Sequence, residues 1–161
     1  MIYNLQIPSR LILSTTEKSA WTGQLSFRPV IAPEVPNPAH PGPQVGELLL
    51  ESTQPETKQL WVSLGIGENL TSSTFRKAGE SCGQWLVEHQ AQDIGLEADF
   101  FDTLGVASGL EAFCEGLLFG AFRFDRHKSK TSTSSPVQVH VLCKGETSQM
   151  EARLKRVTAT M

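Results

Sequence analysis

The chain has 161 residues, a formal net charge of −3 and three cysteines, none of which forms a C-x-x-C pair. An apolar fraction of 39% and a charged fraction of 19% are typical of a globular domain and exclude a disordered chain. The acidic balance excludes a global positive field, so any basic patch must be local. The sparse cysteines favour reduced thiols, and neither a secretory signal nor an apolar run of membrane length is found. We therefore expect a cytoplasmic location and no membrane partner.

The first part of the chain predicts strands around a proline-rich loop. Residues 3–7 alternate apolar and polar side chains, as strands do, and residues 11–13 begin a second extended segment. Six of the nine prolines lie within residues 29–43, and such a stretch cannot donate a regular ladder of hydrogen bonds. A loop is therefore expected there. Residues 46–51 and 58–66 are predicted strands, and the second is apolar on both faces, which indicates an interior strand.

Helices and strands alternate in the remainder of the chain. Apolar stripes with helical spacing run through residues 75–89, 110–122 and 150–161, and period-two alternation runs through residues 94–101 and 137–143. The first stripe places His89 on its buried face. Ser108 followed by Glu111 predicts a capping box at the start of the second helix. This order of elements predicts an α/β domain with a mainly parallel or mixed sheet between helices.

Two glycines between a predicted strand and a predicted helix, Gly65 and Gly67, are candidates for a phosphate-binding loop. The dinucleotide fingerprint requires a third glycine, and this chain has Leu70 at that position. A turn that needs glycine for steric reasons alone is the favoured interpretation.

No catalytic residue and no metal ligand is expected in this chain. His140 and Cys143 are an odd number of residues apart on a predicted strand, so their side chains should point to opposite faces. Cys82 and Cys114 lie on apolar helical faces, where cysteine usually acts as a small hydrophobe. No serine lies in a G-x-S-x-G elbow.

Cations accumulate at the end of the second helix. Arg123, Arg126, Lys128 and Lys130 are four positive charges against the single negative charge of Asp125, which leaves +3. Each cation in the last turn of a helix contributes about 0.3–1 kcal/mol by opposing the negative carbonyl end. This accounts for part of the basic run but not for all of it.

The stretch EGLLFGAFRFDRHKSK at residues 115–130 resembles the signature that ends the second major helix in the N-terminal domain of leucyl (cytosol) aminopeptidases. The residues that carry this resemblance are Glu115, Gly116, Arg123, Phe124, Asp125, Arg126 and Lys128. His127 stands where the family usually has tyrosine. The glycine turn at 64–67 and the sequence Phe75-Arg76-Lys77-Ala78-Gly79 also resemble segments of that domain.

The resemblance implies a macro-domain-like α/β fold with a mixed central sheet flanked by helices. It implies an N-terminal domain over residues 1–146, with the proline-rich loop at 29–43, and the start of a linking helix at 147–161. That helix would lead to a C-terminal peptidase domain, which in the family binds two divalent metals, zinc or manganese. This chain alone is then expected to be non-catalytic and without cofactor, with roles in assembly of a hexamer and in active-site access. The parent protein is expected to be a metal-dependent hydrolase that removes N-terminal amino acids from peptides.

Two other functions remain open. A macro-like fold could bind a nucleotide such as ADP-ribose around Gly65 and Gly67. The basic helix end could contact DNA, as some members of the family do, although a net charge of −3 makes nucleic acid the less favoured partner.

Overall fold

The computed structural model describes residues 11–33, 35, 38–54, 57–67, 70–106, 108–127, 137–144 and 147–160, without the side chains of residues 53, 54, 123–127 and 158–160. Its strands are β1 (Leu11–Glu17), β2 (Leu25–Val30), β3 (Leu48–Gln54), β4 (Thr57–Ser63), β5 (Asp93–Glu97) and β6 (Val137–Cys143). Its helices are the 3-10 turn η2 (Lys18–Ala20), α1 (Ser72–Glu88), α2 (Ala98–Asp102), α3 (Gly109–His127) and α4 (Ser148–Thr160). The predicted strand at residues 3–7 lies outside the described residues.

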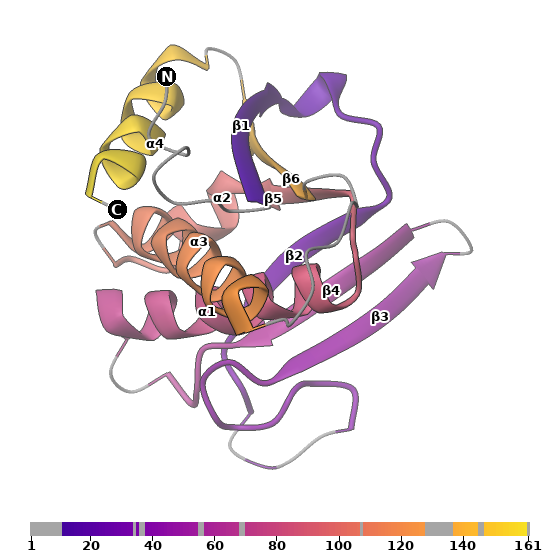
Figure 1. Ribbon diagram of the computed structural model, residues 1–161. Coiled ribbons are helices and arrows are strands. Elements are labelled where there is room, and N and C mark those ends of the chain that lie inside the picture. The colour runs from indigo at the N-terminus through magenta and orange to yellow at the C-terminus, as the bar shows by residue number, and fades with distance from the viewer. Residues whose placement is uncertain are drawn as a thin grey trace.

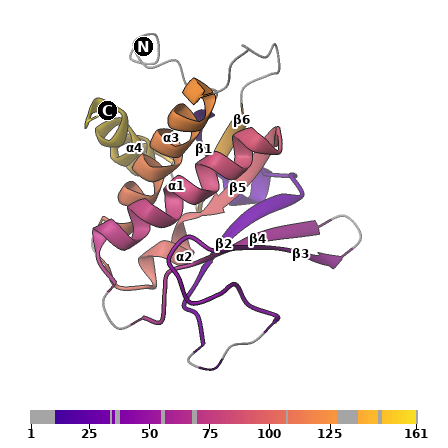
Figure 2. The same ribbon diagram turned by 60° about the horizontal axis from the view of Figure 1, so that its bottom comes forward.

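The strands form one mixed sheet in the order β1-β6-β5-β2-β4-β3, in which β3 pairs antiparallel with β4 and the other pairs are parallel (Figure 1). The chain passes from β4 through α1 to β5, and from β5 through α2 and α3 to β6. Both crossovers move in the same direction along the sheet. Because such crossovers are right-handed, α1 and α3 lie on the same face. Figure 2 shows them side by side, with α4 next to α3.

The two faces of the sheet are covered differently. Ile94 and Leu96 of β5 point to the face that carries α1, α3 and α4, and both are fully buried. Gly95 between them points to the opposite face, which we call the second face. A Cβ atom built on Gly95 would lie 2.8 Å from the Trp21 ring, so this tryptophan from the β1–β2 connection lies directly over the strand. Arg28, Trp61 and His140 also belong to the second face.

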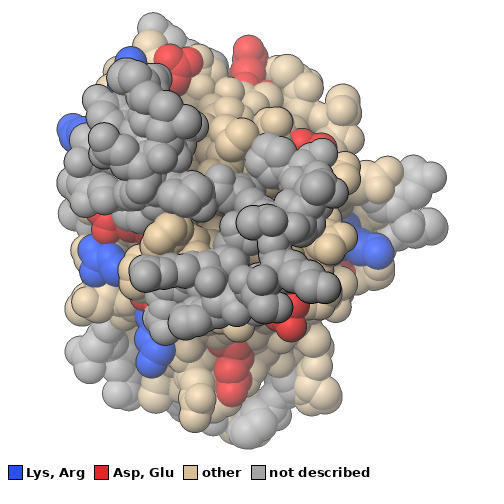
Figure 3. All heavy atoms as spheres, viewed as in Figure 1, with Lys and Arg blue, Asp and Glu red and all other residues tan. Residues whose placement is uncertain are grey.

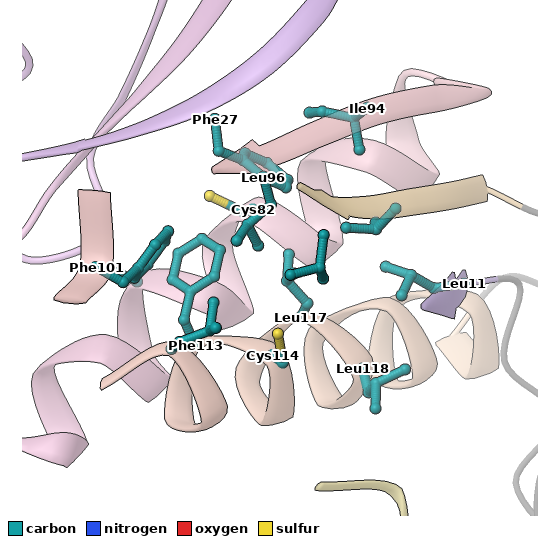
Figure 4. Packing of buried hydrophobic residues seen from close by; sticks show 14 of the residues in the cluster. Leu11, Phe27, Cys82, Ile94, Leu96, Phe101, Phe113, Cys114, Leu117 and Leu118 are labelled. Carbon is teal, nitrogen blue, oxygen red and sulfur yellow. The ribbon is translucent and has the colours of Figure 1, made fainter. Parts of the chain in front are cut away.

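Four phenylalanines form the centre of the core between the sheet and the helices. Phe113 of α3 meets Phe27 of β2 edge to face, with ring centroids 5.6 Å apart, and Phe101 of α2 at 4.8 Å. Phe101 in turn contacts Phe75 of α1 at 6.0 Å. Figure 4 shows the Phe113 ring reaching from α3 towards the sheet beside Phe101. One aromatic chain therefore joins three helices and the central strand.

Strand β2 was not predicted, and the predicted loop at 29–43 begins too early because Pro29 and Val30 belong to this strand. The amide of Leu64 donates to the Val30 carbonyl at 2.8 Å, so the polar groups of Val30 face β4 and those of Pro29 face β5. The pairing with β5 covers only Ser26 and Phe27. Pro29 is tolerated because its missing N–H lies where the ladder has already ended.

Two further predictions were wrong in detail. The strand predicted to reach residue 101 ends at Glu97, and α2 follows because the buried Ala98 and Phe101 are three residues apart, as on a helix. His89 is exposed, not buried: it caps α1, and its ring stacks on Trp85 with centroids 4.3 Å apart. Within the described ranges, no helix combines the length and apolar character that a bilayer span requires.

Candidate functional site

The two helical segments that carry the resemblance meet in space. Arg76 of α1 donates from Nε and Nη2 to Oε1 of Glu115 on α3, at 3.1 and 2.9 Å. Their side chains are 45% and 24% exposed, so this surface ion pair contributes modestly, typically about 0.2–1 kcal/mol. The pair links the two helices next to the point where their backbones come closest.

That contact is made by glycines. A Cβ atom built on Gly79 would lie 2.1 Å from the carbonyl oxygen of Phe113, and one on Gly116 would lie 2.1 Å from that of Arg76. Gly83 and Gly120, one turn further along each helix, would clash in the same way with the backbone of the partner helix. A real Cβ atom cannot occupy these positions, so α1 and α3 pack backbone against backbone. We call Gly79, Gly83, Gly116 and Gly120 the glycine seam.

The seam explains the first two residues of the family signature. Gly116 is required for close approach, and Glu115 beside it holds Arg76. Because Gly79 faces Phe113 and Gly83 faces Leu117, the two helices run in the same direction and end at the same side of the sheet. The motif at this point builds a closely packed helix pair.

The rest of the signature lies at the end of this pair. The backbone places Arg123, Phe124, Asp125 and Arg126 in the last turns of α3. Their side chains, and Lys128 as a whole, lie outside the described part, so the role of the basic run stays a prediction. Helix α1 has no basic residue in its last turn. Cations on α3 would therefore oppose the carbonyl ends of two parallel helices, which is a physical reason for more positive charge than one helix needs.

Charges of both signs lie on the face that Figure 3 shows. Described Lys and Arg side chains are seen mainly along one side of the molecule, with Asp and Glu among and beside them. The concentrated basic stripe typical of nucleic-acid binding is therefore not formed by the described residues of this face. The DNA-binding alternative rests on residues 123–130 and stays a prediction.

Gly65 and Gly67 form the turn after β4, with φ angles of 84° and 94° that favour glycine. The Gly65 amide already donates to the Ser63 hydroxyl at 3.0 Å, and its carbonyl accepts from Ala32 at 2.8 Å. A Cβ on Gly67 would lie 2.8 Å from Ile31 Cγ2. This geometry accounts for both glycines without a ligand, and the phosphate-loop interpretation stays a prediction.

The candidate metal-binding and nucleophilic residues do not gather in one place. Cys82 and Cys114 are fully buried, and burial raises the pKa of the Cys114 thiol to about 12, so it stays protonated at neutral pH. His140 lies on the second face, with Nε2 2.9 Å from Asp93 Oδ1 and Nδ1 3.3 Å from Thr16 Oγ1. Among the described residues, no group of three or more His, Cys, Asp or Glu side chains is placed to hold a metal ion.

Sequence reasoning missed the ion pair that attaches α4. Arg153 donates from Nε and Nη2 to the two oxygens of Glu111 on α3, both at 2.9 Å, and Nη2 lies 3.5 Å from Asp102 Oδ1 on α2. Glu111 was predicted to cap its own helix, and in the structure both of its oxygens accept hydrogen bonds from Arg153. Ser108 has a φ of 61°, outside the extended region of an N-cap residue, so the predicted capping box is not formed.

We expect Glu111→Gln to lower the free energy of unfolding by about 1–2 kcal/mol at pH 7, because it removes a two-point hydrogen bond to a charged partner. The Arg153 hydrogen bonds hold the pKa of Glu111 below its ordinary value. A group with a lowered folded-state pKa stabilises the fold above its unfolded pKa and loses that contribution as the pH falls through the folded value. The difference between wild type and variant should therefore shrink below about pH 4.5, near the ordinary glutamate pKa.

Urea unfolding at pH 7 and at about pH 3.5 would measure both differences. Glu88→Gln at the exposed end of α1 is the control, and it should change stability by no more than about 0.5 kcal/mol. A Glu111→Gln effect that is as large in acid as at neutral pH would contradict the role of this ion pair.

The sequence model described as the N-terminal domain of the cytosol aminopeptidase family matches residues 44–131. A probable cytosol aminopeptidase of Clostridium tetani is 24% identical over 94 residues, which are 58% of this chain and 20% of that protein. The chain thus spans about a fifth of the length of this curated relative.

Solved structures share the fold. A tomato leucine aminopeptidase mutant matches with a TM-score of 0.59 at 16% identity, over 91% of this chain and 35% of its own. The bottromycin maturation enzyme BotP matches with a TM-score of 0.58 at 20% identity, over 86% and 29%. A Trypanosoma brucei macrodomain in complex with ADP matches with a TM-score of 0.56 at 12% identity, over 91% and 68%.

The mixed six-stranded sheet with its flanking helices is a macro-domain-like α/β fold, as predicted. Within that class, the family match covers more than half of the chain and includes both halves of the glycine seam. The chain belongs to the cytosol aminopeptidase family and corresponds to its N-terminal domain.

Proposed function

We propose that this chain is the non-catalytic N-terminal domain of a leucyl-aminopeptidase-like metallopeptidase of the cytoplasm. The observation that carries the proposal is the match to the N-terminal domain of the family, combined with a chain that spans only 20–35% of the aminopeptidases it resembles. In this proposal the parent removes N-terminal amino acids from peptides. Its two divalent metals, zinc or manganese, belong to a C-terminal peptidase domain.

The proposed roles of the domain are assembly of a hexameric parent and control of access to the active sites. Both require a rigid connection to the peptidase domain, and α4 is suited to be the start of it. Its apolar stripe of Met150, Leu154 and Val157 is buried, and Arg153 binds Glu111 on α3. A domain attached after α4 would therefore be held in a fixed orientation relative to α1 and α3, because α4 is packed and bonded against α3.

The test is an activity assay on the purified 161-residue chain with leucine p-nitroanilide and added Mn²⁺ or Zn²⁺. We expect no release of p-nitroaniline above the rate of metal in buffer, while tomato leucine aminopeptidase serves as the positive control. Metal-dependent release that elutes with the chain in size-exclusion chromatography would overturn the proposal. The coding region downstream of Met161 supplies a second test: it should encode a peptidase domain, and a stop codon there would contradict the assignment.

A further inference from the structure

An arginine on the second face of the sheet is held between two aromatic rings. The guanidinium carbon of Arg28 lies 5.0 Å from the centroid of the Trp61 ring and 5.7 Å from that of Phe100. Trp61 belongs to β4, which pairs with β2 on one side, and Phe100 belongs to α2, which follows the strand β5 on the other side. Each cation–π contact contributes about 0.5–1 kcal/mol at an exposed site. The arginine is therefore oriented without using its N–H groups.

Those N–H groups have no partner in the described part of the chain. Arg28 is exposed, and no described residue forms a hydrogen bond or ion pair with it. The adjacent acid is Glu97, which follows the Phe27–Leu96 pair on β5. Glu97 forms its ion pair with Lys18 of η2 instead. The carboxylate of Glu97 is thus neutralised by another cation, and the five donors of Arg28 stay available.

Three buried polar atoms of the described residues lack a hydrogen-bond partner: Nε1 of Trp61, whose ring lies under Arg28, Nδ1 of His40, and Oε2 of Glu51 on β3. The rings of Trp61 and His40 lie edge to face with centroids 5.2 Å apart. The indole N–H can only donate. A buried donor without an acceptor costs about 1–3 kcal/mol, so this position favours any ligand or water that brings an acceptor oxygen.

We propose that Arg28, Trp61 and His40 form an oxyanion subsite on the second face of the sheet, which takes a carboxylate or phosphate group. The planar fork of arginine matches two oxygens of such a group, and the flanking rings hold it in place before the ligand arrives. Trp61 supplies an additional donor from the neighbouring strand, and His40, from the connection after β2, supplies another in the tautomer that carries its proton on Nδ1. The site is separate from the Gly65–Gly67 turn, where the amide and the carbonyl of Gly65 are already bonded within the chain.

The test is a titration of the ¹⁵N-labelled chain with sodium phosphate and, separately, sodium acetate, followed by ¹H–¹⁵N NMR. We expect saturable shifts of the Arg28 Nε–H and the Trp61 indole N–H with at least one anion. The chain has three tryptophans, so the indole signals of Trp21 and Trp85 are internal controls that should not follow the same curve. Saturation by phosphate alone, or by acetate alone, would identify the class of ligand.

Variants separate this site from general charge. Arg28→Gln should weaken binding by about tenfold or more, and Arg28→Lys should lose part of the affinity because it keeps the charge without the fork. Arg76→Gln is the matched control, since Arg76 is an exposed arginine already bound to Glu115, and it should bind as the wild type does. The proposal is overturned if neither anion saturates, if sodium chloride reproduces the shifts, or if Arg76→Gln loses as much affinity as Arg28→Gln. If Arg28→Gln does not fold, the anion affinities of Arg28→Lys and Arg76→Gln are compared instead. The proposal requires weaker binding by Arg28→Lys, and equal affinities would overturn it.

Discussion

Gly116→Ala should lower the free energy of unfolding by about 1–3 kcal/mol, the usual cost of an overpacked contact. The added methyl group would lie 2.1 Å from the Arg76 carbonyl oxygen and 2.9 Å from the Glu80 amide nitrogen, and both are backbone atoms that cannot rotate away. Helix propensity alone predicts the opposite sign, because alanine in a helix interior is favoured over glycine by about 1 kcal/mol. The sign of the result therefore decides whether packing or propensity dominates at this position.

Urea unfolding followed by circular dichroism would measure the change. Gln84→Ala is the control, since Gln84 is exposed on α1 next to Gly83 and should change stability by no more than about 0.5 kcal/mol. Adding Gly79→Ala to Gly116→Ala should cost less than the sum of the two single changes, because helices already pushed apart have room for the second methyl group. A Gly116→Ala variant that is as stable as the wild type would show that the seam is not closely packed.

The sequence predicted the elements whose signal is local. Helical spacing identified α1, α3 and α4, and period-two alternation identified β6, because both patterns arise from neighbouring residues buried on one side. It failed at β2, where Pro29 indicates a loop by every local rule. The structure permits this proline only because β5 stops pairing two residues earlier, a fact about another part of the chain. Sheet order likewise depends on long-range pairing.

The candidate site, too, could be predicted from the sequence only where its signal is local. The resemblance identified Glu115 and Gly116, but local rules treat a glycine inside a helix as a weakness and cannot reveal which backbone it faces. Arg28 comes from a strand that was not predicted. Trp61 comes from an interior strand, and His40 comes from the proline-rich loop. Their proximity follows from the parallel register of Arg28 with Trp61. No spacing along the sequence contains that information, so the oxyanion subsite could be found only in three dimensions.

Phe113→Ala should destabilise the fold more than any other single change proposed for this chain, by about 3–5 kcal/mol. Phe113 is fully buried, and its ring is the link between Phe27 on the sheet and Phe101 on α2 (Figure 4). The cavity cannot close by movement of α3 towards α1, because the glycine seam already holds the two backbones in contact. A site that cannot collapse carries the full cavity cost in addition to the lost transfer free energy.

Phe119→Ala is the matched control, because it removes the same side chain from the same helix at a position that is 42% exposed. It should cost about 1 kcal/mol or less, since less apolar area leaves water there and no closed cavity forms. Phe113→Leu should lie between the two alanine variants. Equal losses for Phe113→Ala and Phe119→Ala in urea unfolding would contradict the packing described for α3. Such a result would show that the glycine seam does not prevent α3 from moving into the cavity. The large loss of stability expected for Phe113→Ala depends on that restraint, because the seam keeps α3 from closing the space that the ring leaves.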